Sequence, residues 1–78
     1  MPTVLRSGPY RFFFYSGDRG EPRHVHVERE AAVAKFWLDP VRLADSHGYR
    51  GAELARLAAL VGEHADELRR AWDDFFDD

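Results

Sequence analysis

An apolar stripe in the C-terminal third of the chain sets the strongest limit on the fold. Apolar residues recur there at spacings of three and four, which is the period of one face of an α-helix. The stripe predicts an amphipathic helix over about residues 52–76. Its members are Leu54, Leu57, Ala58, Val61, Ala65, Leu68, Trp72 and Phe75. A helix of this kind needs a second layer of structure on which to bury its apolar face.

The length of this helix makes it hard to fit over a small sheet. About 25 residues in a helix would reach roughly 37 Å, whereas a seven-residue strand spans roughly 23 Å. The helix is therefore expected either to overhang the sheet or to break, and Gly62 is the expected break point. Phe75 and Phe76 stand side by side near its end, and one helix face cannot bury both. Two alternatives follow for this pair, a frayed terminus or a contact with another chain.

Three short segments before residue 39 have the character of β-strands. They cover about residues 10–16, 23–29 and 32–38, and they are rich in aromatic and β-branched residues. Glycine and proline punctuate the stretches between them, and the short connections favour an antiparallel meander. Residues 3–5 are expected either to add a short fourth strand or to lead into the first one.

The Asp39-Pro40 dipeptide is expected to start a short helix over about residues 40–47. Aspartate is a favoured N-cap and proline is favoured at the first helical position, so Asp39 is assigned a structural role. Gly48 is expected to end this helix, with His47 interacting with its last carbonyls. The expected fold is thus α+β, with a three-stranded antiparallel sheet backed by a short helix and a long C-terminal amphipathic helix.

Alternation along the second strand separates its valines from its histidines. Val25 and Val27 share one face, and His24, His26 and Glu28 share the other. If the valines meet the helices, the histidines face away from that core.

Aromatic residues are expected on both faces of the sheet. One face of the first strand carries Tyr10, Phe12 and Phe14 and the other carries Phe13 and Tyr15, while Trp37 opposes its neighbours on the third strand. A second apolar face on so small a sheet predicts either a partner chain, which includes a second copy of this chain, or a cleft lined by rings.

Composition narrows the class of protein. The 78 residues are expected to form one domain over residues 1–78, and the absence of cysteine excludes disulfides and thiolate metal sites. No apolar run approaches the roughly 18 residues that a membrane span needs, and the N-terminus lacks a signal-peptide cleavage pattern, so a cytoplasmic protein is expected. Residues 1–35 carry a net charge of +2 and residues 36–78 a net charge of −5. The overall charge of −3 does not favour nucleic acid as the partner.

Five blocks of sequence, spread over nearly the whole chain, carry a family resemblance. They read MPTVLR, GPYRFFFYS, GEPRHVHVER, AKFWLDPV and AWDDFF. In these blocks the chain resembles a family of short bacterial proteins called domain of unknown function 4160. The resemblance implies a small protein encoded beside another small protein, in pairs proposed to be toxin–antitoxin-like modules. It brings no catalytic residues with it. The leading expectation is therefore a partner-binding protein, one component of such a pair, with no cofactor.

The pair His24 and His26 leaves three interpretations open. As a metal site, the pair needs a third ligand, and the candidates by residue type are Asp18, Glu21, Glu28 and His47. As an acid/base couple, the two rings could serve a metal-independent ribonuclease that uses the 2′-hydroxyl of RNA as nucleophile. As structural residues, they pack against aromatic rings or contact the partner chain.

The expected binding surface surrounds the two histidines. Arginines would hold phosphates or acidic groups and rings would stack on bases or on the partner. The candidates are Arg11, Arg23, Arg29, Tyr10, Phe12, Tyr15 and Trp37. His64 lies on the border of the helical stripe and is not expected to be a ligand.

Overall fold

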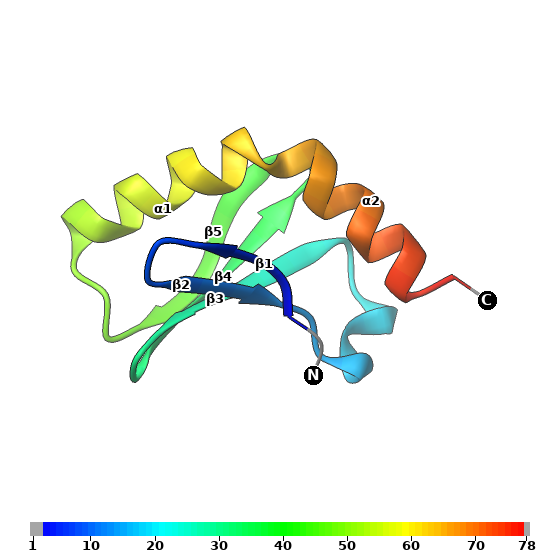
Figure 1. The fold of residues 1–78 in the computed structure, drawn as a ribbon, viewed down its shortest axis with the longest axis horizontal. Helices are drawn as coiled ribbons and strands as arrows, with labels where there is room; N and C mark the ends of the chain where they lie inside the picture. The colour runs from blue at the N-terminus through cyan, green and yellow to red at the C-terminus, as the bar shows by residue number, and fades with distance from the viewer. Residues whose placement is uncertain (1–2, 78) are drawn as a thin grey trace.

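A five-stranded antiparallel sheet carries both helices of the protein on one of its faces (Figure 1). The structure is a computed structural model that describes residues 3–77. The strands lie in the sheet in the order of the sequence, so each pairs with the next. Their bounds are β1 Thr3–Ser7, β2 Tyr10–Phe13, β3 His24–Arg29, β4 Ala32–Leu38 and β5 Val41–His47. A 3-10 helix η1, Ser16–Gly20, joins β2 to β3, and α1, Gly51–Glu63, and α2, Ala65–Phe75, follow the sheet.

The α+β class and the antiparallel meander are confirmed, but the predicted count of three strands is wrong, because β1 and β5 extend the sheet to five. β4 has the predicted bounds, and β3 begins one residue later than predicted. Of the two alternatives for residues 3–5, the structure has the additional N-terminal strand, β1. β2 is shorter than predicted because the chain leaves the sheet after Phe13 and turns into η1. Glu30 has a φ of 53° in the two-residue turn between β3 and β4, where Arg29 pairs with Ala32.

The predicted helix over residues 40–47 is wrong, because this segment forms β5 at the edge of the sheet. Asp39 and Pro40 make the two-residue turn of a hairpin in which Leu38 pairs with Val41. The backbone of residues 41–47 satisfies the open edge of β4, which a helix would have left unpaired. Asp39 therefore caps no helix. Its carboxylate instead accepts hydrogen bonds from Arg23 at 2.8 Å and from Arg69 at 2.7 Å.

The long C-terminal helix breaks close to the predicted point. α1 ends at Glu63, His64 has a non-helical ψ, and α2 begins at Ala65. Figure 1 shows α1 and α2 one after the other on the same side of the sheet, with a bend between them. Phe75 and Phe76 both fold back on Phe14, with ring centroids 5.8 and 6.2 Å away, so residues of the same chain partly bury this pair.

The core lies between the helices and the face of the sheet that carries the valines. The helical stripe packs here as predicted, with Leu57, Val61 and Leu68 fully buried. The sheet contributes Phe12, Val25, Val27, Phe36 and Leu38, and Phe14 joins them from just after β2; none of these side chains has exposed surface. No helix within residues 3–77 is long and apolar enough to cross a membrane.

One ionic network fastens the start of α1 to the sheet. Glu53 accepts two hydrogen bonds from the Arg29 guanidinium, at 2.7 and 2.8 Å, and one from the Tyr10 hydroxyl at 2.7 Å. The Arg29 and Tyr10 hydrogen bonds lower the pKa of Glu53 to about 2. Glu53 thus stays ionised at neutral pH and holds two strands to the first turn of α1.

Candidate functional site

A cluster of one carboxylate and two imidazoles lies where η1 meets the start of β3. The 3-10 turn brings Asp18 back towards the strand, and the Tyr15 backbone N–H donates a 2.9 Å hydrogen bond to Asp18 Oδ2. β3 supplies His24 and His26, whose rings lie 5.0 Å apart between centroids. The three side chains thus come from two elements that are adjacent in the sequence.

The ligand-type atoms of this cluster converge on one small volume. Asp18 Oδ2 lies 3.0 Å from His26 Nε2 and 3.1 Å from His24 Nε2. All three atoms lie within 4.8 Å of one another. Within residues 3–77 this is the one group of three or more such side chains whose donor atoms lie so close together.

His24 is fully buried, and one of its two ring nitrogens lacks a hydrogen bond. Nδ1 lies 2.9 Å from the Pro22 carbonyl oxygen, which can only accept, so Nδ1 carries a proton. Nε2 lies 3.1 Å from Asp18 Oδ2, but the two atoms form no hydrogen bond. Nε2 therefore has no hydrogen-bond partner among the described residues 3–77. Leaving such a group buried and unsatisfied costs roughly 1–3 kcal/mol.

Aromatic rings hold both imidazoles in place. The His24 ring meets Trp37 and Trp72 with centroid distances of 5.6 and 5.0 Å, and Trp72 belongs to α2. The His26 ring stacks on Phe13 at 5.4 Å and meets the edge of Tyr15 at 4.7 Å. These contacts restrict the rotamers of both rings, so the cluster is preorganised by packing as well as by hydrogen bonds.

Asp18 and His26 have the charge states that metal ligands need. Burial by itself raises the pKa of Asp18, but the Tyr15 N–H and the two histidines outweigh it and lower that pKa below the usual value. Burial lowers the pKa of His26, although the Asp18 carboxylate opposes this effect. At neutral pH the cluster therefore presents an ionised carboxylate and a neutral imidazole, the forms that bind metal ions.

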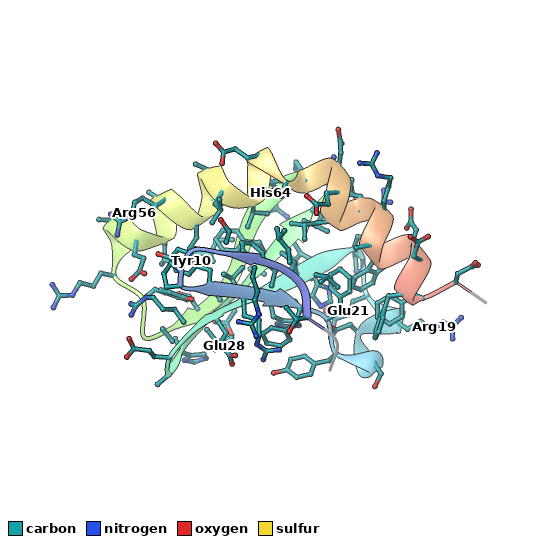
Figure 2. The ribbon with its side chains drawn as sticks, in the orientation of Figure 1. Tyr10, Arg19, Glu21, Glu28, Arg56 and His64 are labelled. Atoms are coloured by element: carbon teal, nitrogen blue, oxygen red, sulfur yellow. The ribbon has the colours of Figure 1, made fainter. Side chains whose placement is uncertain are left out.

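Of the four side chains considered as a third ligand, the structure brings only Asp18 to the histidine pair. Glu21 binds Lys35 at 2.6 Å, and Glu28 binds Arg11 at 2.8 Å. Figure 2 shows Glu21 and Glu28 at different places along the sheet. His47 does not end a helix as expected. It lies on β5, is exposed, and has Asp45 at 3.6 Å.

The structure does not gather the seven predicted surface residues on one face. Phe12 belongs to the core and has no exposed surface, so its place in a binding surface is wrong. Tyr10 and Arg29 bind Glu53 of α1, and Arg23 binds Asp39 and Asp73. Three remain close to the histidine pair: Tyr15 meets His26, Trp37 meets His24, and Arg11 lies over Phe13, on which His26 stacks.

The second apolar face of the sheet is covered by residues of the same chain. Phe13 is only 1% exposed, because the Arg11 guanidinium lies 4.2 Å from its ring centroid on one side and His26 stacks on the ring. No pocket was found over residues 3–77, and the expected cleft lined by rings is absent there. Of this face, Tyr15 is the large aromatic residue that stays exposed.

Two contributors to the site were not anticipated from the sequence. The Pro22 carbonyl fixes the tautomer of His24, and no sequence pattern marks such a backbone contact. Trp72 was expected in the core, where it does lie, but the ring also covers His24. The sequence shows only that Trp72 belongs to the apolar stripe of the helix. The stripe does not show which strand residue the Trp72 ring contacts.

One protein family matches most of the chain. No curated protein and no solved structure matches the chain. Residues 10–73 match the family described as a domain of unknown function, DUF4160. This match covers β2 to α2, including all three residues of the cluster. The chain belongs to this family, DUF4160.

Proposed function

We propose that the protein binds one divalent transition-metal ion, of the class of Zn²⁺, through Asp18, His24 and His26. The observation that carries this proposal is the buried Nε2 of His24, which has no hydrogen-bond partner within residues 3–77 and lies beside a carboxylate oxygen and a second imidazole nitrogen. A metal ion would accept the lone pair that this nitrogen otherwise leaves unused.

The charges of the cluster call for a cation among the three side chains. With Nδ1 donating to Pro22, a neutral His24 directs the lone pair of Nε2 into the cluster, 3.1 Å from an ionised carboxylate oxygen. Two electron-rich atoms at this distance repel unless a proton or a metal ion lies between them. A proton on Nε2 would hold the two atoms together only through a hydrogen bond, which needs a nearly straight path to Asp18 Oδ2, and these two atoms form no hydrogen bond. A metal ion bound by both atoms does not lie on the straight line between them, so the geometry favours a metal ion over a proton.

The donor set indicates which metals fit. Imidazole nitrogens suit Zn²⁺ and Fe²⁺, whereas Mg²⁺ and Ca²⁺ prefer oxygen ligands throughout. In a tetrahedral zinc site with bonds of about 2.0–2.1 Å, neighbouring ligand atoms lie about 3.3–3.4 Å apart. The two separations from Asp18 Oδ2, 3.0 and 3.1 Å, are close to this value, and the third separation, between the two imidazole nitrogens, is within 4.8 Å. The hydrogen bond from His24 Nδ1 to a backbone carbonyl is also the usual outer contact of a metal-binding histidine.

The same geometry argues against the ribonuclease interpretation. A general acid or base must reach the proton that it transfers. The His24 side chain has no exposed surface, and Trp37 and Trp72 cover the ring. His24 can therefore hold an ion inside the protein, but it cannot contact an RNA backbone without movement of α2.

The proposal is tested by calorimetric titration of Zn²⁺ into the purified chain without a histidine tag. We expect one ion per chain. Loss of an outer contact typically weakens metal binding about 10–100-fold, so loss of a direct ligand should weaken it by more than about 100-fold. Asp18→Asn and His26→Gln are the variants to measure. Asparagine at position 18 keeps an oxygen for the Tyr15 N–H, so this variant is expected to remain folded.

His47→Gln is the matched control, because His47 lies on β5 with a side chain that is 76% exposed. This variant should bind Zn²⁺ as the wild type does. The proposal fails if the wild type takes up no stoichiometric ion, or if His47→Gln weakens binding as much as His26→Gln does. Circular dichroism of each variant separates loss of the ligand from loss of the fold.

As a second candidate function, we propose that the chain binds a small protein partner along the edge strand β5, as one component of a toxin–antitoxin-like pair. β5 pairs only with β4, so the other edge of its backbone has no strand partner within residues 3–77. Leu43 in the middle of this strand is 42% exposed. Edge strands with exposed apolar residues are common docking sites for an added strand.

Co-expression with the product of the neighbouring gene tests this second candidate. We expect the two proteins to co-purify and Leu43→Lys to abolish the complex, since lysine on an edge strand opposes pairing. Ala55→Lys, at an exposed position of α1, is the control and should leave the complex intact. Absence of a complex with the wild type, or equal loss in both variants, would contradict the candidate.

A further inference from the structure

The three proposed ligands are not equally accessible to solvent. The side chain of His24 has no exposed surface, whereas those of Asp18 and His26 are 12% and 13% exposed. An ion held among them would be closed off on the His24 side by Trp37 and Trp72. Any approach to the ion must therefore pass Asp18 and His26.

The protein offers three ligands to an ion that commonly takes four. No fourth histidine, cysteine or carboxylate atom within residues 3–77 joins the cluster. Glu21, the nearest further carboxylate, lies 3.9 Å from the Nδ1 side of His24, which faces away from the cluster, and it binds Lys35. Zinc sites with four protein ligands are structural, whereas sites with three leave one position for water or an exogenous ligand.

The charge of the loaded centre indicates the kind of ligand that would take this position. A divalent ion with two neutral imidazoles and one carboxylate keeps one net positive charge. The Lys35 ammonium, opposite His26 in the pairing of β3 with β4, binds Glu21 at 2.6 Å, so Glu21 offsets its charge. The charge of the loaded centre therefore favours an anionic oxygen donor over a neutral one.

We infer that the fourth coordination position of the ion is an exchangeable site for an anionic oxygen ligand, a carboxylate or phosphate group, which enters past Asp18 and His26. This inference rests on the proposed metal binding and adds a ligand class to it. In the exchange, an oxygen lone pair of the anion forms the new bond to the ion as the bound water leaves. No oxidation or proton transfer is required.

Cobalt(II) substitution tests the inference, because the visible d–d bands of this ion report coordination number and ligand exchange. The Co²⁺-loaded protein is titrated separately with acetate, with dimethyl phosphate and with neutral acetamide. We expect saturable changes in the bands with at least one anion and none with acetamide. The anion that acts distinguishes a carboxylate ligand from a phosphodiester.

Lys35→Gln sharpens the experiment. This variant leaves the Glu21 carboxylate without its cation, so it should weaken the binding of the anion several-fold and leave the Co²⁺ bands without anion unchanged. Arg56→Gln is the matched control, since Figure 2 places Arg56 at the start of α1, on the helical side of the sheet. It should behave as the wild type does.

The outcomes separate this inference from the proposed function. Intense tetrahedral bands that neither anion alters would mean a closed site, which overturns the inference and keeps the metal site. A chain that binds neither Co²⁺ nor Zn²⁺ would overturn the metal site, and the inference with it. Equal changes with acetamide and with the anions would overturn the assignment of an anionic ligand.

Discussion

Zinc at a concentration one hundred times its dissociation constant is expected to raise the free energy of unfolding by about 2.7 kcal/mol. The ion binds the folded cluster, whereas the unfolded chain holds no preformed site. For a domain of this size, the gain corresponds to a rise in melting temperature of roughly 10–20 °C. Thermal unfolding followed by circular dichroism, with and without Zn²⁺, measures the effect, and a chelator should reverse it.

Two controls make this result specific to the cluster. Asp18→Asn should melt at the same temperature with and without Zn²⁺, because the variant lacks the charged ligand. Mg²⁺ should not stabilise the wild type, since imidazole is a poor ligand for it. Equal stabilisation by both ions, or of both proteins, would show that the ion acts elsewhere on the chain.

Truncation of Trp72 to alanine is expected to destabilise the fold by about 3–5 kcal/mol, the usual cost of removing a large buried aromatic side chain. Trp72 is 6% exposed and lies between Phe14, Phe76 and His24, with ring centroids 5.2, 4.3 and 5.0 Å away. Its loss would leave a cavity under α2 and uncover His24. Urea denaturation gives the change in the free energy of unfolding.

Trp72→Phe is the matched comparison, because it keeps a ring against Phe14 and His24 and leaves a smaller cavity. Its cost should be clearly below that of the alanine variant. A cost of less than about 1 kcal/mol for Trp72→Ala would contradict the packing described here, since such a value is typical of surface substitutions. Because His24 loses its cover, Zn²⁺ affinity should fall in the alanine variant as well.

Periodicity predicted the elements that have a clear apolar period of their own. β4 alternates between buried and partly buried positions along its whole length, and the helical stripe packs on the sheet as its spacing indicates. The prediction of a helix over residues 40–47 is wrong for a physical reason. Asp-Pro suits the start of a helix and also a hairpin turn, and local preference cannot decide between them. The open edge of β4 decided in favour of β5, and that edge exists only in the folded sheet.

The candidate site was predictable only in part. Alternation placed His24 and His26 on one side of β3, and residue type placed Asp18 among four possible ligands. The choice of Asp18 depends on the 3-10 turn of η1, which has no apolar period. The burial of His24 depends on a ring from α2, far along the chain, and strand alternation alone suggested an exposed position.

The meander also sets the order in which the site can form. The three ligands lie within residues 18–26, so bringing them together closes a short loop at low entropic cost. Trp72, which covers His24, lies near the end of the chain and reaches the ring only when α2 docks. As synthesis proceeds from the N-terminus, the ligands can meet before their cover exists. An ion bound by the three proposed ligands would then have free access to His24 in the nascent chain, whereas in the finished protein Trp37 and Trp72 close that side.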